Sequence, residues 1–197
     1  MSGTFPSSPG FEAVNFKINT PTLTSETLSG KKRRVGMGHS YYTFTTKFPN
    51  QTAYNMGPVL GFVAAQYGQL DNFSIVLPEL SFTKNTTLGS ITVTTSSAKA
   101  IGDNSVPLAG FSSGDTFLLA GDFFKFSNHS KVYMCTADWV YGQPLYFSGS
   151  LVSAVPSGTQ IVFNSVPFNV ILDNEIQEFD VGIGGITTMQ LDMREVW

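Results

Sequence analysis

The fold class is indicated most clearly by residues 41–48, which read YYTFTTKF. Tyr42, Phe44 and Phe48 occupy alternating positions among polar residues, and the stretch is rich in aromatic and β-branched side chains. This period of two is typical of a β-strand with one face against a core. We therefore predict a strand here, and a β-hairpin over residues 25–48 whose turn lies at or near a basic segment.

One helix is expected after this strand. Asn50 and Thr52 are candidate N-caps, and apolar residues recur at helical spacing up to Gly68, which is suited to end a helix. Pro58 removes a backbone hydrogen bond, so the helix either kinks there or begins there. We place the helix at about residues 52–67.

The rest of the chain is predicted to be β. Short apolar runs recur at roughly 8–12-residue spacing between Gly and Pro turns, as in sandwiches and barrels. The predicted strands lie at residues 11–18, 73–77, 90–94, 116–119, 123–126, 131–136, 145–152, 160–163, 168–172 and 187–196. The expected class is mainly β: a β-sandwich or barrel of short antiparallel strands with the helix packed on it. Residues 123–136 are predicted to form a second hairpin.

The length of 197 residues fits one domain, or one domain with a small second lobe. We expect an N-terminal arm and first strand over residues 1–24 and one β-rich domain over 25–197, with a small second β lobe at about 100–165. Hydrophobic residues make up 42% and charged residues only 13%, which argues against intrinsic disorder. Such low charge fits either a surface covered by partners or one solvated by Ser, Thr and Asn.

Charge is unevenly distributed along the chain. Residues 1–102 contain eight Lys/Arg and four Asp/Glu, whereas residues 103–197 contain three and ten. The asymmetry either steers the head of one copy toward the tail of another or arises by chance. The net charge of −3 gives no general case for nucleic-acid binding.

The sequence also bears on the compartment. A single cysteine, Cys135, excludes an intramolecular disulfide and a multi-cysteine zinc site. Residues 1–10 lack the charged and apolar regions of a secretory signal, and no run of about 18 apolar residues predicts a membrane span. We expect synthesis in a reducing cytoplasm and no membrane insertion.

No constellation of residues predicts an enzyme. His39 and His129 lack further ligands at short spacing, and Cys135 fits a packed strand better than a nucleophile. The acidic stretch 173–180 fits a solvated loop or a cation contact but lacks the pattern of an EF-hand. The glycines at 182–185 open no helix and are expected to form a turn or bulge. We predict no catalytic, cofactor-binding or metal-binding residues.

The basic run carries the candidate contact residues, Lys31, Lys32, Arg33 and Arg34. Such residues bind phosphates in some proteins. In a loop they more often form a solvated face or a salt-bridging contact to another chain. We take these four as candidate subunit-contact residues.

The order of segments along the chain resembles tail proteins of tailed bacteriophages. The resemblance lies in the basic segment and aromatic strand of 25–48, the helix-Gly-Phe element of 59–73, the stretches 119–126 and 131–138, and the final strand 189–197. It covers most of the chain from about residue 11. The similar proteins are tail-tube and distal-tail (Dit-like) proteins.

This resemblance implies a tail-tube-like fold in a structural component of the virion tail or baseplate. Copies are expected to form a ring around the DNA channel, with a hexamer favoured and a trimer as the alternative. The ring would join the tail tube to other tail and baseplate proteins, and DNA would pass through without specific binding. The resemblance implies no catalytic residues.

Two other functions stay open. A carbohydrate-binding β-module for receptor recognition would use exposed aromatics such as Trp139, Tyr141 and Tyr146, although core or interface packing is the favoured explanation of such residues. A hydrolase on a jelly roll would need a catalytic constellation that the sequence does not show.

Overall fold

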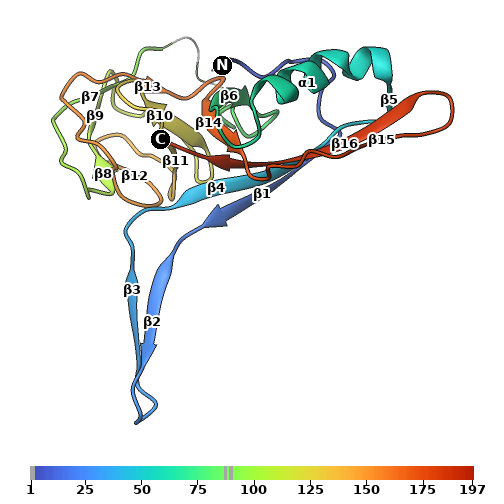
Figure 1. Cartoon of the computed structure of the whole chain (residues 1–197). Helices are drawn as coiled ribbons and strands as arrows, with labels where there is room; N and C mark the ends of the chain where they lie inside the picture. The colour runs from blue at the N-terminus through green and yellow to red at the C-terminus, as the bar shows by residue number, and fades with distance from the viewer. Residues whose placement is uncertain (1–2, 87, 89–90) are drawn as a thin grey trace. The chain divides into compact units, whose positions relative to one another are not determined.

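The computed structural model describes residues 3–86, 88 and 91–197 (Figure 1). The chain divides into two compact units. Unit 1 comprises Met1–Lys17, Tyr42–Pro78 and Pro167–Trp197, and unit 2 comprises Ile18–Tyr41 and Glu79–Val166. Both units are therefore assembled from segments that lie far apart in the sequence.

Unit 1 is built on a seven-stranded sheet with the order β1-β4-β16-β14-β6, in which β5 and β15 also pair with β16. The strands are β1 (Ala13–Asn19), β4 (Tyr41–Lys47), β5 (Gln51–Thr52), β6 (Phe73–Val76), β14 (Pro167–Leu172), β15 (Phe179–Val181) and β16 (Ile186–Glu195). β16 pairs antiparallel with β4, β5, β14 and β15. This last strand therefore joins the separate segments of unit 1.

The alternation of residues along β16 explains its central place. Met189, Leu191 and Met193 are buried, whereas Gln190 on the opposite face is exposed. Met193 lies opposite Phe44 of β4 on one side and opposite Leu172 of β14 on the other. The predicted strand with one solvated face is confirmed.

Two groups of aromatic rings fill the core of unit 1. One contains Phe5, Phe11, Phe48, Phe62 and Phe73, and the other contains Phe16, Tyr42, Phe44 and Phe168. Phe62 of the helix meets Phe73 of β6 edge to face, with ring centroids 5.2 Å apart. Edge-to-face aromatic pairs of this kind add stabilisation beyond the burial of their area.

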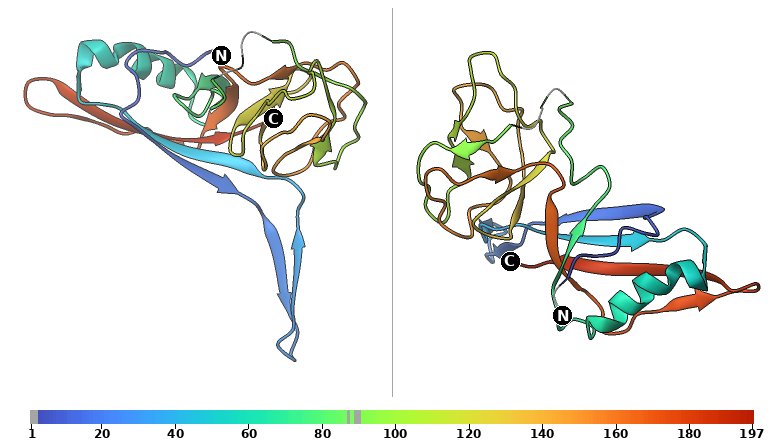
Figure 2. Two further views of the ribbon diagram at one scale, coloured as in Figure 1. Left: turned by 180° about the vertical axis from the view of Figure 1, so that it is seen from behind. Right: turned by 90° about the horizontal axis from the view of Figure 1, so that it is seen from above.

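The helix α1 spans Ala53–Ala65 and packs on the sheet through Met56, Val59 and Val63. Thr52 is the N-cap, because its hydroxyl accepts a hydrogen bond from the Asn55 amide. The helix begins before Pro58 and continues through it, so the alternative of a start at this proline is wrong. Figure 2 shows α1 lying alongside β15 and β16 in both views.

The mainly β class with one packed helix is confirmed. Within the described residues the seven-stranded sheet stays open, with β1 and β6 at the ends of its strand path, so a closed barrel does not form. In the same part of the chain no helix is long and apolar enough to cross a membrane.

Unit 2 contains several short antiparallel sheets. Their strands are β2 (Thr22–Glu26), β3 (Lys32–Gly36), β7 (Thr94–Thr95), β8 (Ser105–Val106), β9 (Leu108–Ala109), β10 (Phe123–Phe126), β11 (Val132–Met134), β12 (Leu145–Tyr146) and β13 (Ile161–Val162). They pair as β11-β10-β13, β12-β8, β2-β3 and β7-β9. The predicted second hairpin is confirmed, with Phe124 of β10 opposite Tyr133 of β11.

A cluster of buried side chains holds these short strands together. It includes Phe117, Phe124, Phe126, Tyr133, Trp139 and Phe147. Single bridges, such as Cys135 with Phe147 and Thr94 with Gln160, connect the small sheets. Burial of large aromatic side chains therefore replaces long hydrogen-bond ladders as the source of stability.

Three predicted strands of unit 2 are not formed as expected. Of residues 145–152, only Leu145 and Tyr146 form a strand, β12. Of residues 90–94, Ser90 lies outside the described residues and only Thr94 belongs to a strand, β7. Residues 116–119 make a single bridge, between Thr116 and Val140. The physical reason at Leu119 is that its amide donates to the Asp122 carboxylate instead of to a neighbouring strand.

The Asp122 side chain is a buried polar centre of unit 2. Its carboxylate accepts hydrogen bonds from the Thr83 hydroxyl at 2.7 Å and from the amides of Lys84 and Leu119, both at 3.1 Å. The carboxylate is fully buried. Asp122 therefore fixes the loop around Thr83 to the turn before β10.

We predict that Asp122→Ala lowers the free energy of unfolding of unit 2 by about 3 kcal/mol, because three donors lose their acceptor. Urea denaturation followed by tryptophan fluorescence measures this change. Asp115→Ala is the matched control, since Asp115 is exposed and accepts one backbone hydrogen bond, from Ser112. Equal stability of the two variants would contradict the role given to Asp122.

Candidate functional site

The residues with the most reactive chemistry have structural roles. Cys135 is fully buried, and its thiol donates to the Ala137 carbonyl at 2.9 Å. Burial raises the pKa of this thiol to about 11, so it stays protonated near neutral pH. In the described residues no group of three or more His, Cys, Asp or Glu side chains could hold a metal ion.

His129 is held in a local hydrogen-bond network. One ring nitrogen lies 2.9 Å from the Asn128 side chain and the other lies 3.0 Å from the Tyr133 hydroxyl. Burial lowers the pKa of His129, and the charges of Lys125 and Lys131 lower it further. The imidazole is therefore neutral at pH 7 and braces the β10–β11 turn.

The three aromatic residues considered for carbohydrate binding differ in their exposure to solvent. Trp139 is only 4% exposed, stacks near Phe111 at 4.4 Å between ring centroids, and donates from Nε1 to the Gln143 carbonyl. Tyr141 and Tyr146 are partly exposed. The packing interpretation is confirmed for Trp139, because its side chain is buried and its N–H is already hydrogen-bonded.

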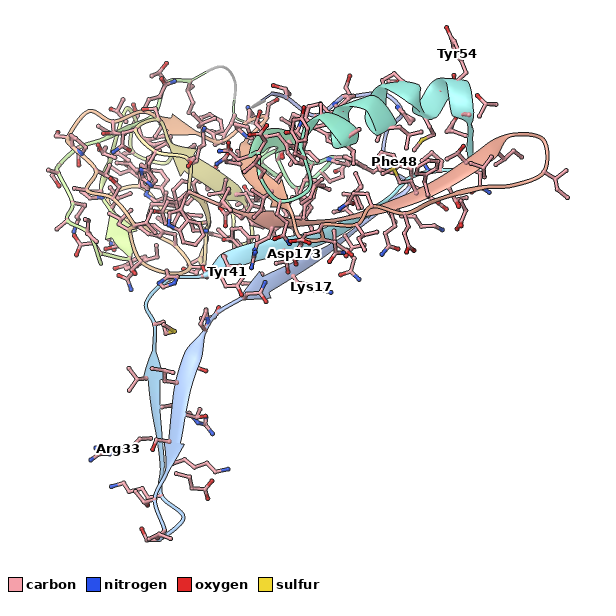
Figure 3. All side chains as sticks on the ribbon, in the orientation of Figure 1. Lys17, Arg33, Tyr41, Phe48, Tyr54 and Asp173 are labelled. Carbon is pink, nitrogen blue, oxygen red and sulfur yellow. The ribbon has the colours of Figure 1, made fainter. Side chains whose placement is uncertain are left out.

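The predicted contact residues lie on a separate hairpin. β2 and β3 pair antiparallel, with Glu26 opposite Lys32 and Ser25 opposite Arg33. Lys31 ends the turn, in which Gly30 adopts a φ of +78° that favours glycine. Figure 3 shows Arg33 on this hairpin with its side chain pointing away from the ribbon into solvent.

Every residue of the two strands is exposed. Lys32 and Glu26 form an ion pair at 3.7 Å whose partners are both more than half exposed, so it adds little stability. A hydrogen bond anchors the base of the hairpin: the Ser150 hydroxyl donates it to the Gly38 carbonyl. The predicted hairpin over 25–48 is therefore corrected: the hairpin is formed by Thr22–Gly36, and Tyr41–Lys47 is β4 of unit 1.

One face of this hairpin is apolar. Leu23 and Val35 lie directly opposite each other, are 64% and 62% exposed, and stand next to the exposed Met37. The alternate residues, including Thr24 opposite Arg34, point to the other face. We call the first set, Leu23, Val35 and Met37, the apolar face of the hairpin. An antiparallel strand pair normally packs such a face on a core.

A second exposed hairpin belongs to unit 1. β15 and β16 are joined by the glycine-rich turn at 182–185, as predicted for these residues, with φ values of +81° at Gly184 and +72° at Gly185. Val181 and Ile183 are exposed near its end, as is Ile186. Unit 1 therefore also presents apolar side chains to its surroundings.

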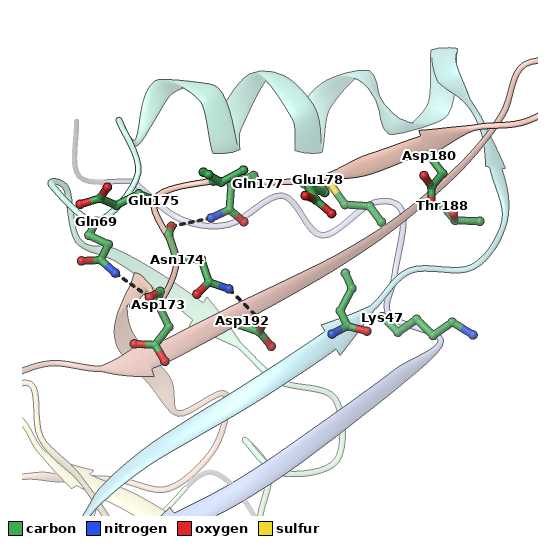
Figure 4. Close-up of a pocket in the computed structure, with 13 residues that line it drawn as sticks. Lys47, Gln69, Asp173, Asn174, Glu175, Gln177, Glu178, Asp180, Thr188 and Asp192 are labelled. Carbon is green, nitrogen blue, oxygen red and sulfur yellow. Dashed lines mark hydrogen bonds between the residues drawn. The ribbon is translucent and has the colours of Figure 1, made fainter.

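An open groove of about 820 Å³ lies along unit 1 (Figure 4). We call it the acidic groove, because its lining includes five carboxylates, Asp173, Glu175, Glu178, Asp180 and Asp192, and one cation, Lys47. The polar lining is partly fixed, since the Asn174 amide donates to Asp192 at 3.2 Å and the Gln177 amide donates to the Asn174 carbonyl at 2.7 Å.

Two of the charges in and near the groove are already paired. Asp173 lies 3.3 Å from Arg194, and Lys47 lies 3.3 Å from Glu12. Among the described residues no lysine or arginine lies within ion-pair distance of Glu175, Glu178 or Asp180. These three carboxylates are the ones available to an outside cation.

No protein-family model and no curated protein sequence matches the chain. The case for a function therefore depends on the surfaces described above. Sequence reasoning found the four basic residues but missed the apolar face beside them. The alternation of Leu23 with Thr22 and Thr24 could have indicated a strand with one apolar face. The segment was interpreted as an arm because of its composition.

We predict that the Cys135 thiol reacts with a disulfide reagent at pH 8 at least about a hundredfold more slowly in the native protein than in the unfolded chain. The folded state also holds the proton of the Cys135 thiol more tightly than a thiol with the ordinary pKa of 9.0 does. The free energy of unfolding should therefore fall as the pH rises from about 9 to about 11. Cys135→Ser should remove this part of the pH dependence; rapid native labelling would contradict the account.

Proposed function

We propose that the chain is a structural component of a bacteriophage tail, whose copies form a ring around the DNA channel and join the tail tube to neighbouring tail or baseplate proteins. The observation that carries the proposal is the fully exposed hairpin β2–β3 with its apolar face. The order of sequence segments resembling phage tail proteins supplies the particular assembly.

The exposed hairpin is costly unless another chain covers it. Two strands by themselves are marginally stable in water, and burying a side chain such as Leu23 is worth about 1.5–3 kcal/mol. The exposed end of β15–β16 adds a second apolar surface. A protein with two different apolar surfaces favours head-to-tail contacts between copies. Such contacts close into a ring when the rotation from one copy to the next allows it.

The edge of the main sheet offers a further contact. β1 is the end strand of the seven-stranded sheet, and an edge strand can pair with a strand of another chain. At β6, in contrast, the N-terminal segment already covers the edge, because the Phe5 amide donates to the Ser74 carbonyl. The edge at β1 therefore suits continuation of the sheet across a subunit boundary.

The alternative function, carbohydrate binding in host recognition, has less support. Of the three aromatics considered, Trp139 is buried, and sugar stacking needs an open ring face. Tyr141 lies in a groove of about 460 Å³ in unit 2 beside Lys99 and Gln143, which is the place such a ligand would take. Retention of monomeric protein on a glycan column would favour this alternative.

We predict that the purified protein forms closed rings with a central channel in negative-stain micrographs, hexameric or else trimeric by mass photometry. Leu23→Ser/Val35→Ser should weaken the association at least about tenfold, because the two apolar side chains lose burial worth more than 1.4 kcal/mol. Labelling of the chain in phage particles that contain it should then place it in the tail.

The matched control is Thr22→Ser/Thr24→Ser, which changes the opposite face of the same hairpin. Circular dichroism should show that both double variants keep the wild-type fold, since the four positions are exposed. A wild-type protein that stays monomeric at all concentrations, or is absent from the tail, would contradict the proposal.

A further inference from the structure

We infer that the hairpin β2–β3 of one copy docks into the acidic groove of the next copy, so that copies assemble head to tail. The inference rests on the proposed function, because the partner is a second copy of this chain. It names which two surfaces meet and what holds them together.

The hairpin is the cationic partner. Residues 22–36 contain four cations and one carboxylate, so the hairpin has a net charge of +3. Arg33 and Lys31 lie on the side of the apolar face, whereas Arg34 and Lys32 lie on the other side. Cations on both faces can therefore contact two walls of a groove while Leu23 and Val35 lie against its apolar parts.

The acidic groove is complementary in charge. Among the described residues, Glu175, Glu178, Asp180 and Asp192 have no ion-pair partner. Asp192 already accepts hydrogen bonds from Thr45 and Asn174, so the other three are the carboxylates available to the hairpin. Carboxylates crowded in one groove repel each other, and a guanidinium relieves the repulsion with paired hydrogen bonds to a carboxylate. The exposed Ile176 in the lining gives an apolar contact.

The chain as a whole carries the same separation of charge. Unit 1, which has the groove, contains eight Asp/Glu and three Lys/Arg and has a net charge of −5. Unit 2, which has the hairpin, contains six and eight and has a net charge of +2. Copies are therefore steered toward contacts between unlike units.

A second copy fits these observations better than other partners. Nucleic acid would satisfy the hairpin but would be repelled by the groove, and a basic peptide would satisfy the groove but leave the apolar face exposed. Copies of the same chain satisfy both surfaces: the hairpin of each copy docks on one neighbour, and its groove receives the hairpin of the other neighbour. This is a heterologous interface, the kind that generates rings.

The test uses two charge-reversed full-length chains. The hairpin variant is Lys31→Glu/Arg33→Glu/Arg34→Glu, and the groove variant is Glu175→Lys/Glu178→Lys/Asp180→Lys. Each alone should associate at least about tenfold more weakly than wild type by mass photometry. An equimolar mixture should assemble again into rings with an even number of alternating copies, because each reversed hairpin meets a reversed groove and each native hairpin meets a native groove.

Charge-conserving variants are the matched controls. Lys31→Arg, which keeps both guanidinium groups, and Glu175→Asp/Glu178→Asp/Asp180→Glu should assemble like wild type within about threefold. Raising the salt concentration from 50 to 500 mM should weaken wild-type assembly, since exposed charge pairs are screened. Circular dichroism checks the fold of every variant.

The outcomes separate this inference from the proposed function. Wild-type rings that persist in both charge-reversed variants would overturn the docking and leave the ring proposal standing. Variants that fail to assemble alone and also when mixed would overturn the docking as well, because the two surfaces would not meet. Wild-type protein that is monomeric throughout would overturn both. Duplex DNA bound by the hairpin, with assembly unchanged on reversal, would assign the hairpin to nucleic acid instead.

Discussion

The pairing of β16 with both β4 and β14 is the constraint on which unit 1 depends. The last strand supplies buried residues such as Leu191 and Met193 between two strands whose sequence positions differ by more than a hundred residues. The sheet therefore cannot be completed until the end of the chain is in place. Loop-closure entropy makes such long-range pairing slow, and the aromatic clusters in the core of unit 1 provide the burial that offsets it.

Unit 2 achieves stability in a different way. Its strands are short, and its backbone groups are satisfied by single bridges and by side chains such as Asp122 and Asn85, whose amide donates to the Phe117 carbonyl at 2.8 Å. A dense aromatic core compensates for the short ladders. Cys135 and His129 belong to this packed structure, which explains why reactive residue types occur without an evident reactive site.

The surfaces of the chain are those on which the proposed assembly depends. The hairpin β2–β3 is exposed along its whole length, with an apolar face and cations on both sides. The acidic groove and the exposed end of β15–β16 lie in unit 1. Charge would then direct the encounter of two copies, while burial of apolar side chains would provide most of the affinity.

The sequence by itself determined the mainly β class, the helix with either Asn50 or Thr52 as its cap, the β10–β11 hairpin and the alternating last strand. Local alternation, capping and turn residues are sufficient for these, because the interactions lie within a few residues. It also located Lys31–Arg34, but could not show that Leu23 faces Val35, since the register of a hairpin depends on its turn. Only the tertiary structure decided that Trp139 is buried, that 116–119 is held by Asp122 instead of forming a strand, and that residues 173–192 surround one groove with Lys47. The physical reason is that burial and charge proximity arise from contacts between distant segments, which no local pattern encodes.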